Sequence, residues 1–313
     1  MTTSFELRLA PGTVLTGKWK QGRYRVERLL GEGANGKVYL VEHNRRLLAM
    51  KVGGDAVDLQ SEINVLRQLA IHRRKSEPFL IGVDDFTHTD GMDYPFYVMR
   101  YVRGSALHEY VQREGADWFP LIGFHLLGKL AALHEAGWTF GDLKQENVLV
   151  GEYGRVELVD YGGVTAQGKS VRQFTEIYDR GYWNAGGRTA EGAYDLFSFA
   201  VLCIHLFEGK RLVHLSQSLL PQNRTTDELI RLAEGHPALK PFAGWLARAL
   251  RGGFANAREG AAVWQRIMYG SGVKMRKPSA SGWIAGLFAG SMLALAAAIV
   301  WMMSEGMLTF GLP

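Results

Sequence analysis

The sequence predicts an α+β protein of two unequal lobes, and three observations lead to this fold class. Residues 24–52 read as three strands joined by turns, with Gly-Glu-Gly after the first strand and His-Asn-Arg-Arg after the second. Residues 57–70 carry apolar side chains at the period of a helix. Two further strand-like runs follow at 79–86 and 94–102, and helices dominate from about residue 105 onward.

The helical remainder is clearest at residues 117–137 and 194–208. A strand-rich first third followed by helices is typical of an α+β protein in which two lobes pack together. The length of 313 residues suits this arrangement. A hydrophobic content of 47% and a charged content of 21% are ordinary for a globular protein.

The composition excludes an internal disulfide and leaves the choice of partner open. Cys203 is the single cysteine of the sequence, which favours a reducing compartment. It lies in an apolar helical stretch, so we expect it to fill part of the core. The net charge of +5 is mild and by itself identifies no partner. The basic run at residues 73–75 is expected to form an exposed loop, and we expect no nucleic-acid partner.

Residues 283–303 form a run without a charged side chain. As a helix this run would span about 32 Å, enough to cross a bilayer core of roughly 30 Å. Trp283 and Trp301 suit the interfacial belts, and basic residues at 274–277 precede the run. The positive-inside rule then predicts that the preceding part of the chain is cytoplasmic and is tethered to the cell membrane by one helix. The alternative is a buried core helix.

A glycine-rich turn lies between the first two predicted strands. Residues 31–38 fit the pattern G-x-G-x-x-G-x-V, and a strand follows, whereas a dinucleotide site would be followed by a helix. Glycines between antiparallel strands let the backbone approach a polyphosphate. Lys51 follows in an apolar strand, and Glu62 on the predicted helix could pair with it to hold a cation against phosphates. The alternative is that Lys51 only extends from an edge strand to solvent.

A second group of polar residues adjoins buried strands further along the chain. Asp142, Lys144 and Asn147 come directly before the apolar run 148–150, and Asp160 ends another apolar strand in "VELVDYGG". Asp142 could accept the proton of an attacking hydroxyl, while Lys144 neutralises the moving phosphoryl group. Asp160 and Asn147 offer oxygen ligands for a metal ion. Together these residues predict a site for phosphoryl transfer.

In order and spacing, these motifs resemble the protein kinase superfamily, and specifically the Hanks-type serine/threonine kinases of the bacterial, membrane-anchored kind. The resemblance covers about residues 24–267 and rests on "GEGANGKV", "AMK", "EINVL", "DLKQEN" and "DYG". The segment "YVMRYVRGSAL" is similar to the hinge, which implies that Met99 is the gatekeeper and that Tyr101 and Val102 contact adenine. The segment "YDLFSFAVL" is similar to the central helix of the C-lobe, with Asp195 buried.

The resemblance implies a bilobal kinase fold that binds ATP with Mg²⁺, or with Mn²⁺, and transfers the γ-phosphate to a serine or threonine hydroxyl of a protein substrate. The implied catalytic residues are Asp142 and Lys144, and the implied metal ligands are Asn147 and Asp160. The implied nucleotide-binding residues are Leu30, Gly31, Glu32, Gly33, Ala34, Asn35, Gly36, Lys37, Val38, Ala49, Lys51, Glu62, Met99, Tyr101 and Val102.

The resemblance, together with the uncharged run at 283–303, divides the chain into parts. An N-terminal extension precedes a kinase domain, and a linker, a transmembrane helix and a short external tail follow it. The expected boundaries are 1–23 for the extension, 24–268 for the domain (N-lobe 24–100, C-lobe 103–268), 269–282 for the linker, 283–303 for the helix and 304–313 for the tail.

Two departures from the family pattern carry predictions. The His-Arg-Asp of the family is Phe140-Gly141-Asp142 here, which removes the arginine that normally binds an activation-loop phosphate. We therefore expect activity that does not require phosphorylation of that loop. The Ala-Pro-Glu motif is also absent, which leaves the peptide-binding platform open. Arg258 resembles the C-lobe arginine that pairs with the missing glutamate, and Asp179 is the candidate replacement partner.

Two other functions compete with a protein kinase. A Gly-Asp pair at this position also occurs in small-molecule phosphotransferases and in RIO-like atypical kinases, so a small-molecule or lipid kinase is the alternative, whereas Lys144 favours a protein acceptor. A membrane-tethered pseudokinase scaffold is disfavoured because the four residues that pseudokinases tend to lose are all present: Lys51, Asp142, Asn147 and Asp160.

The C-terminal run offers one possible contact between copies of the chain. Small residues that include Gly286 and Gly290 recur every four positions, which would let two membrane helices approach closely and form a homodimer. The alternative is that glycine and alanine are simply common in membrane helices.

Overall fold

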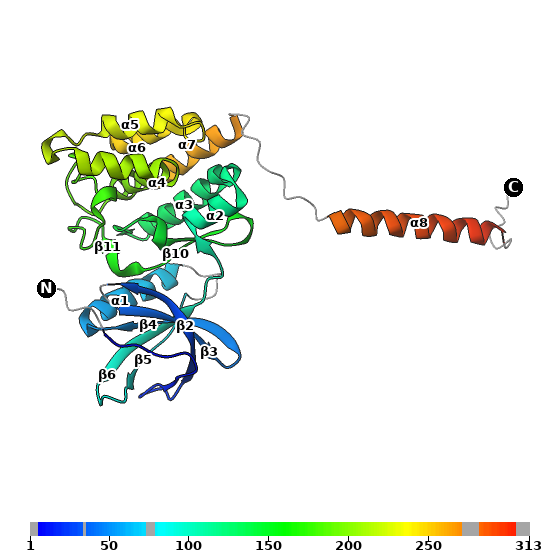
Figure 1. Ribbon diagram of the computed structural model, residues 1–313, viewed down its shortest axis with the longest axis horizontal. Helices are drawn as coiled ribbons and strands as arrows, with labels where there is room; N and C mark the ends of the chain where they lie inside the picture. Colours follow the sequence, from blue (N-terminus) through cyan, green and yellow to red (C-terminus); the bar gives the residue numbers. More distant parts are fainter. Residues whose placement is uncertain (1–5, 34–35, 73–78, 271–281, 305–313) are drawn as a thin grey trace. The chain divides into compact units, whose positions relative to one another are not determined.

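The strand-rich first third of the chain forms an antiparallel sheet, as the sequence predicts. A computed structural model describes residues 6–33, 36–72, 79–270 and 282–304. The strands follow the order β1-β2-β3-β4-β6-β5 across the sheet (Figure 1). Their bounds are β1 Val14–Thr16, β2 Arg23–Gly33, β3 Gly36–His43, β4 Arg46–Gly53, β5 Leu80–Thr87 and β6 Asp93–Arg100.

The β2–β3 and β3–β4 connections show how local sequence sets this sheet. The sequence predicts a turn at Gly-Glu-Gly, but β2 continues through it, because Gly31 pairs with Val38 and Gly33 with Gly36. The β3–β4 turn uses Asn44 at φ 50° and Arg45 at φ 61°. Two positive φ angles suit the twist of a tight hairpin. Gly36 and Val38 are thereby held on a continuous strand.

The N-terminal segment packs on the face of the sheet that is remote from the helices. Leu7, Leu9 and Leu15 are buried in one cluster with Tyr39 and other sheet residues. The Tyr39 hydroxyl donates to the main-chain oxygen of Leu7 at 3.2 Å and accepts from the main-chain nitrogen of Leu9 at 3.3 Å. Since β1 also pairs with β2, part of the segment assigned to an extension contributes to the N-lobe core.

Helix α1 (Ala56–His72) covers the other face of the sheet and agrees with the predicted helix at 57–70. Its apolar stripe includes Leu59, Ile63 and Leu66, which are buried in the same cluster as Ala49 and Met99 of the sheet. A stripe at this spacing is the expected buried face of an amphipathic helix. The packing therefore directs the neighbouring residues of α1 toward the sheet.

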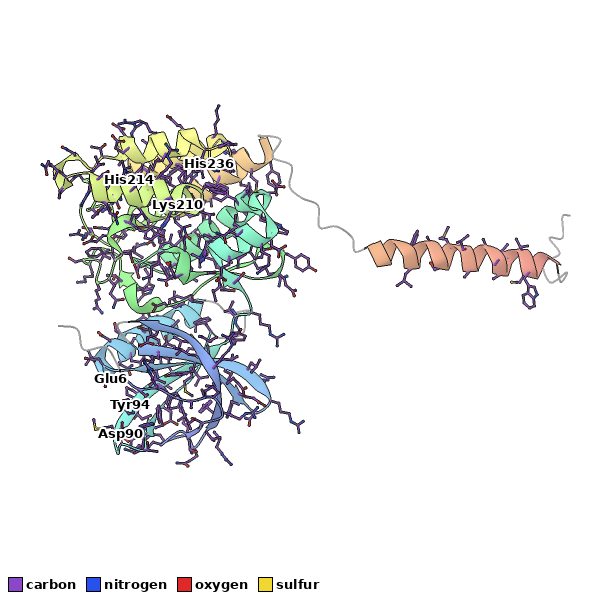
Figure 2. All side chains as sticks on the ribbon, in the orientation of Figure 1. Glu6, Asp90, Tyr94, Lys210, His214 and His236 are labelled. Atoms are coloured by element: carbon purple, nitrogen blue, oxygen red, sulfur yellow. The ribbon has the colours of Figure 1, made fainter. Side chains whose placement is uncertain are left out.

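The C-lobe is mainly helical, and Figure 1 shows its helices gathered on one side of the sheet lobe. In Figure 2 the labelled side chains of Asp90 and Tyr94 belong to the sheet lobe, and those of Lys210, His214 and His236 to the helical lobe. The helices are α2 Leu107–Glu114, α3 Phe119–Glu135, α4 Gly192–Ser218, α5 Thr226–Gly235, α6 Ala243–Leu250 and α7 Ala257–Gly270. The predicted helices at 117–137 and 194–208 correspond to α3 and α4, and Cys203 is buried in α4 as expected.

Aromatic side chains from several helices form the centre of the C-lobe. Trp264 of α7 is buried, stacks on Phe242 at 4.1 Å between ring centroids, and packs edge-on against Phe119 and Phe199. Its indole nitrogen donates to the Pro120 carbonyl at 2.8 Å. Large buried rings with a satisfied polar atom contribute strongly to core stability. This core fixes α3 and α4, which support the loops between them.

Short strands and turns carry the loops between α2 and α4. The strands are β7 Ser105–Ala106, β8 Trp138–Thr139, β9 Val148–Val150, β10 Val156–Leu158 and β11 Thr165–Ala166, paired in the orders β10-β9-β7 and β11-β8. The 3₁₀ helices are η1 Ala116–Trp118, η2 Gln145–Asn147, η3 Glu152–Gly154, η4 Tyr161–Gly163, η5 Glu176–Tyr178, η6 Pro221–Asn223 and η7 Lys240–Phe242. The apolar run 148–150 is β9, with Val148 and Val150 buried as predicted.

The chain divides into two units between Val273 and Lys274, and the second is described at residues 282–304. It contains α8 (Gly282–Ser304), whose side chains from 286 to 302 are exposed. Among the residues that the structure describes, no helix is long and apolar enough to cross a membrane. The structure therefore does not support the membrane-spanning helix predicted at 283–303. The homodimer through Gly286 and Gly290 stays a prediction, and residues 271–281 and 305–313 of the predicted linker and tail lie outside the described residues.

Candidate active site

Lys51, Glu62 and Asp160 come together from three separate elements. Lys51 lies on β4, Glu62 on α1, and Asp160 follows β10. The Lys51 ammonium lies 2.7 and 2.8 Å from the two Glu62 oxygens and 3.0 Å from Asp160 Oδ1. The Tyr97 hydroxyl donates to Glu62 at 2.9 Å. The structure thus forms the Lys51–Glu62 pair that the sequence suggested and adds Asp160 to it.

The environment keeps this ammonium charged. Burial would lower the pKa of Lys51, which is 5% exposed, but the carboxylates of Asp160 and Glu62 outweigh burial and raise it. Burial raises the pKa of Glu62, and Lys51 counteracts that rise only in part. Burial and the Glu62 carboxylate raise the pKa of Tyr97 well above its ordinary value, so its hydroxyl remains a donor. A fixed cation is thereby held beside Asp160.

Asp160 adopts a special backbone conformation and stays partly open to solvent. Its φ of 60° and ψ of 86° place it in the left-handed region, at the start of η4. The side chain is 49% exposed. Desolvation by the surrounding protein would raise the pKa of Asp160, but Lys51 and the backbone N–H of Gly162 lower it. The result is an ionised, accessible carboxylate that could ligate a cation.

Asp142, Lys144 and Asn147 form a second group on the loop before β9. Lys144 Nζ lies 2.5 Å from Asp142 Oδ2, and Asn147 donates its amide nitrogen to the Asp142 main-chain oxygen at 2.9 Å. The hydroxyl of Thr175 donates to Asp142 Oδ1 at 2.9 Å. The Asp142 carboxylate thus already accepts a hydrogen bond from an aliphatic hydroxyl. A general base that deprotonates a serine or threonine hydroxyl must lie at this distance from it.

The remaining predicted nucleotide residues line the sheet side of the site. Ala49 and Met99 are register partners and are buried, and Leu30 and Val38 pack partly buried against the same cluster. Tyr101 and Val102 follow β6 and are half-buried. Of these residues, Ala49, Met99, Leu30 and Val38 belong to one apolar cluster, which suits a flat apolar ring such as adenine.

The glycine-rich hairpin has one glycine, Gly36, that no other residue could replace without a displacement of the neighbouring backbone. Gly36 has φ 142°, and a Cβ there would lie 2.2 Å from the Val52 carbonyl oxygen. Gly31 and Gly33 border open space. Lys37 is buried and pairs with Glu32 at 3.1 Å, so its ammonium is engaged within the hairpin. Ala34 and Asn35 lie outside the described residues.

Comparison with known proteins decides between the families that such a site allows. The protein kinase domain family matches residues 24–242, which is more than half of the chain. The chain belongs to the protein kinase family. Members of this family phosphorylate proteins with ATP, so this kinase is a phosphotransferase.

Individual relatives agree with this assignment. The kinase is 38% identical over 265 residues to the serine/threonine-protein kinase YabT of Bacillus subtilis. The aligned region covers 82% of this chain and 75% of YabT. It is 30% identical over 193 residues to the serine/threonine-protein kinase PknE of Mycobacterium tuberculosis, covering 58% of this chain and 34% of PknE. The solved structure of vaccinia related kinase 3 aligns with a TM-score of 0.57 at 16% identity, over 86% of this chain and 92% of the other, and supports the bilobal fold.

The structure explains why this kinase lacks the arginine of His-Arg-Asp. Gly141 has φ 81°, and a Cβ there would lie 2.6 Å from the Gly163 carbonyl oxygen. A side chain of any size is therefore strained at this position. The backbone N–H groups of Phe140 and Gly141 donate to the buried carboxylate of Asp195 at 2.7 and 2.9 Å. Asp195 thus holds the catalytic loop in place from α4.

The suggested pairing of Arg258 with Asp179 is wrong. Arg258 lies 2.5 Å from Glu135 at an exposed position. Asp179 is fully buried and pairs instead with Arg188 at 2.7 Å, because Arg188 folds back within the same loop. The sequence offered no spacing signal for this pair, nor for the contact between Thr175 and Asp142. Both depend on how the loop before α4 folds on itself.

Proposed function

We propose that this kinase transfers the γ-phosphate of ATP to a serine or threonine hydroxyl of a protein. The observation that carries the proposal is the hydrogen bond of 2.9 Å from the Thr175 hydroxyl to Asp142, whose other oxygen contacts Lys144. The names of YabT and PknE, both serine/threonine-protein kinases, support the choice of acceptor.

Asn147 and Asp160 fit a Mg²⁺ site that is completed by substrate phosphates. Asn147 uses its amide nitrogen on the Asp142 main chain, which leaves its carbonyl oxygen as a neutral ligand. Asp160 adds an accessible carboxylate. Mg²⁺ is often bound by one or two protein side chains together with substrate phosphates, and Asn147 and Asp160 offer such a pair. Held by Asn147 and Asp160, Mg²⁺ or Mn²⁺ would supply positive charge that neutralises the charge developing on the transferred phosphoryl group.

The residues of the chain then have distinct tasks. The Lys51 ammonium, oriented by Glu62, holds the phosphates of ATP. Asp142 orients the acceptor hydroxyl and accepts its proton as the new oxygen–phosphorus bond forms and the bond to the β-phosphate oxygen breaks. Lys144 compensates the negative charge of the transferred group. The oxygen that joined the β- and γ-phosphates stays on the β-phosphate, and ADP is the leaving group.

A panel of acceptors tests this function. The full-length chain is incubated with labelled ATP, Mg²⁺ and either a generic protein or a set of small alcohols, followed by identification of the labelled amino acids. We expect label on serine and threonine of the protein. Label on the small alcohols alone would indicate the competing small-molecule phosphotransferase. Nucleotide binding without any transfer would indicate a pseudokinase scaffold.

Phosphatase treatment tests whether a loop phosphate is needed. Because Gly141 replaces the phosphate-binding arginine, we expect turnover to stay within about twofold of the untreated enzyme. Mass spectrometry confirms that residues such as Thr165 and Ser170 carry no phosphate, and mock-treated enzyme serves as the control. A collapse of turnover that returns on incubation with ATP would refute the prediction.

We also propose that the kinase is held at the cell membrane through α8, with the kinase domain in the cytoplasm. Leu287, Phe288 and Leu293 on α8 are more than half exposed, which leaves apolar surface for lipid. Fractionation of cells that express either the full chain or residues 1–270 tests this. We expect the full chain in the membrane pellet and the shorter chain in the supernatant. Equal distribution of both would remove the proposal.

A further inference from the structure

The loop between β11 and α4 is closed by main-chain hydrogen bonds between its two ends. Gly168 donates to the Ala190 carbonyl at 2.9 Å, and Ala190 donates back to Lys169 at 2.7 Å. Val171 donates to the Arg188 carbonyl at 2.8 Å, and Ser170 bridges with Thr189. The first residues of the loop are therefore paired with its last residues. The segment between them, which includes Thr175, forms a closed loop.

A buried carboxylate lies inside this closed loop. Asp179 is 0% exposed and accepts hydrogen bonds from the main-chain nitrogens of Gly181 and Tyr182 at 3.2 and 3.1 Å and from the Tyr194 hydroxyl at 2.9 Å. Arg188 supplies the opposite charge, with its Nε 2.8 Å and its terminal nitrogen 2.7 Å from Asp179 Oδ2. A buried charge persists only when it is paired and hydrogen-bonded in this way.

Arg188 also reaches the segment that holds Thr175. Its guanidinium lies over the ring of Phe174 at 4.3 Å from the centroid. Phe174 directly precedes Thr175, whose hydroxyl donates to Asp142 at 2.9 Å. Arg188 thus makes three contacts, to the Asp179 carboxylate, to the Phe174 ring and, through its carbonyl, to Val171. All three lie within a few residues of the contact between Thr175 and Asp142.

We propose that Arg188, held by the buried Asp179, is a positioning residue that keeps Thr175 and the acceptor side of the site aligned with Asp142. The inference rests on the proposed kinase function. In this kinase, glycine at position 141 cannot bind a phosphate on the loop between β11 and α4. The charge-assisted contacts between Arg188 and the buried Asp179 hold that loop instead.

This role predicts a selective loss. Lys51 and Glu62 do not contact Arg188, so nucleotide binding is expected to survive its removal. Transfer to a protein depends on the geometry around Asp142, where a displacement of about 1 Å can cost roughly 100-fold. Hydrolysis of ATP by water requires no aligned protein acceptor. The ratio of protein phosphorylation to ATP hydrolysis therefore reports positioning apart from general damage to the fold.

The test compares three variants of the full chain. Arg188→Ala is expected to lower kcat for protein phosphorylation by roughly 30-fold or more, with KM for ATP and the rate of ATP hydrolysis within about threefold of wild type. Arg188→Lys keeps the charge but loses the planar fork, and is expected to recover part of the activity. Arg231→Ala is the matched control, because Arg231 also pairs with a carboxylate, that of Glu228 at 2.7 Å, but at an exposed position outside this loop, and it is expected to behave like wild type.

The outcomes separate this inference from the proposed function. No transfer to protein by the wild type refutes the function itself. Wild-type transfer together with an unchanged Arg188→Ala variant refutes the positioning role, and so does a parallel fall in transfer, hydrolysis and melting temperature. Phe174→Leu provides a second test if Arg188→Ala does not fold. It removes only the ring beneath the guanidinium, and a transfer-to-hydrolysis ratio equal to wild type would overturn the proposal.

Discussion

Replacing Asp142 with asparagine is expected to lower kcat for protein phosphorylation by about 10²–10⁴-fold. The carboxylate accepts the Thr175 hydroxyl at 2.9 Å and contacts Lys144 at 2.5 Å. An amide of the same shape removes the negative charge and the oxygen that can take up a proton, and its NH₂ group would face the donors of Lys144. The contacts of Lys51 with Glu62 and Asp160 are untouched, so KM for ATP should change little.

Steady-state kinetics with a protein acceptor measures this effect, and calorimetry with ATP checks that the nucleotide still binds. Asp227→Asn is a suitable control, because Asp227 pairs with Arg251 at an exposed position in the helical lobe. A variant that also carries Lys144→Ala should lose little more activity than Asp142→Asn alone, since residues that act as a unit are not additive. Full activity of Asp142→Asn would exclude Asp142 as the base.

Replacing Lys51 with methionine is expected to lower kcat/KM for ATP by about 10²–10³-fold, since it removes a fixed cation from the developing phosphate charge. It also leaves the buried Glu62 without its partner, so the free energy of unfolding should fall by about 3 kcal/mol. Glu62→Gln keeps an acceptor for Lys51 and for Tyr97, and Lys51 retains Asp160 at 3.0 Å. We therefore expect a smaller decrease in kcat/KM for ATP for Glu62→Gln, roughly tenfold, because the Lys51 ammonium is held less firmly in its orientation.

Kinetics at varied ATP and thermal unfolding measure the two effects. Lys129→Met is the matched control, because Lys129 also pairs with a carboxylate, that of Glu157 at 2.9 Å, but outside the site. It should lose some stability and keep its kcat/KM for ATP. A larger decrease in kcat/KM for ATP in Glu62→Gln than in Lys51→Met would contradict the assignment of Lys51 as the phosphate-binding cation.

Much of the fold and of the site could be predicted from the sequence because the relevant signals are local. The apolar period of 57–70 predicts α1, and the same stripe explains why Glu62 is directed toward Lys51. Asp142 and Asn147 lie on one short loop, so their contact follows from nearness in the chain. The glycine pattern predicts a turn, yet Gly31 to Gly33 extend β2, since the two strands of the hairpin pair as far as Gly33 and Gly36.

Other features depend on tertiary packing that has no period or motif. Asp179 and Arg188 meet because the loop before α4 closes on itself, and the same closure brings Thr175 to Asp142. Arg258 was paired by analogy with the family, but its guanidinium lies beside Glu135. The burial of Leu7 and Leu9 also depends on tertiary packing, since their short alternation before Pro11 identifies no partner until Tyr39 is seen opposite them.

Titration of the chain with a non-hydrolysable ATP analogue at millimolar Mg²⁺ tests most directly whether these groups serve one nucleotide. We expect saturable binding with one analogue per chain, weakened at least tenfold both by omission of Mg²⁺ and by Asp160→Asn, as the loss of a metal ligand requires. Absence of binding, or binding that is indifferent to both changes, would contradict the account.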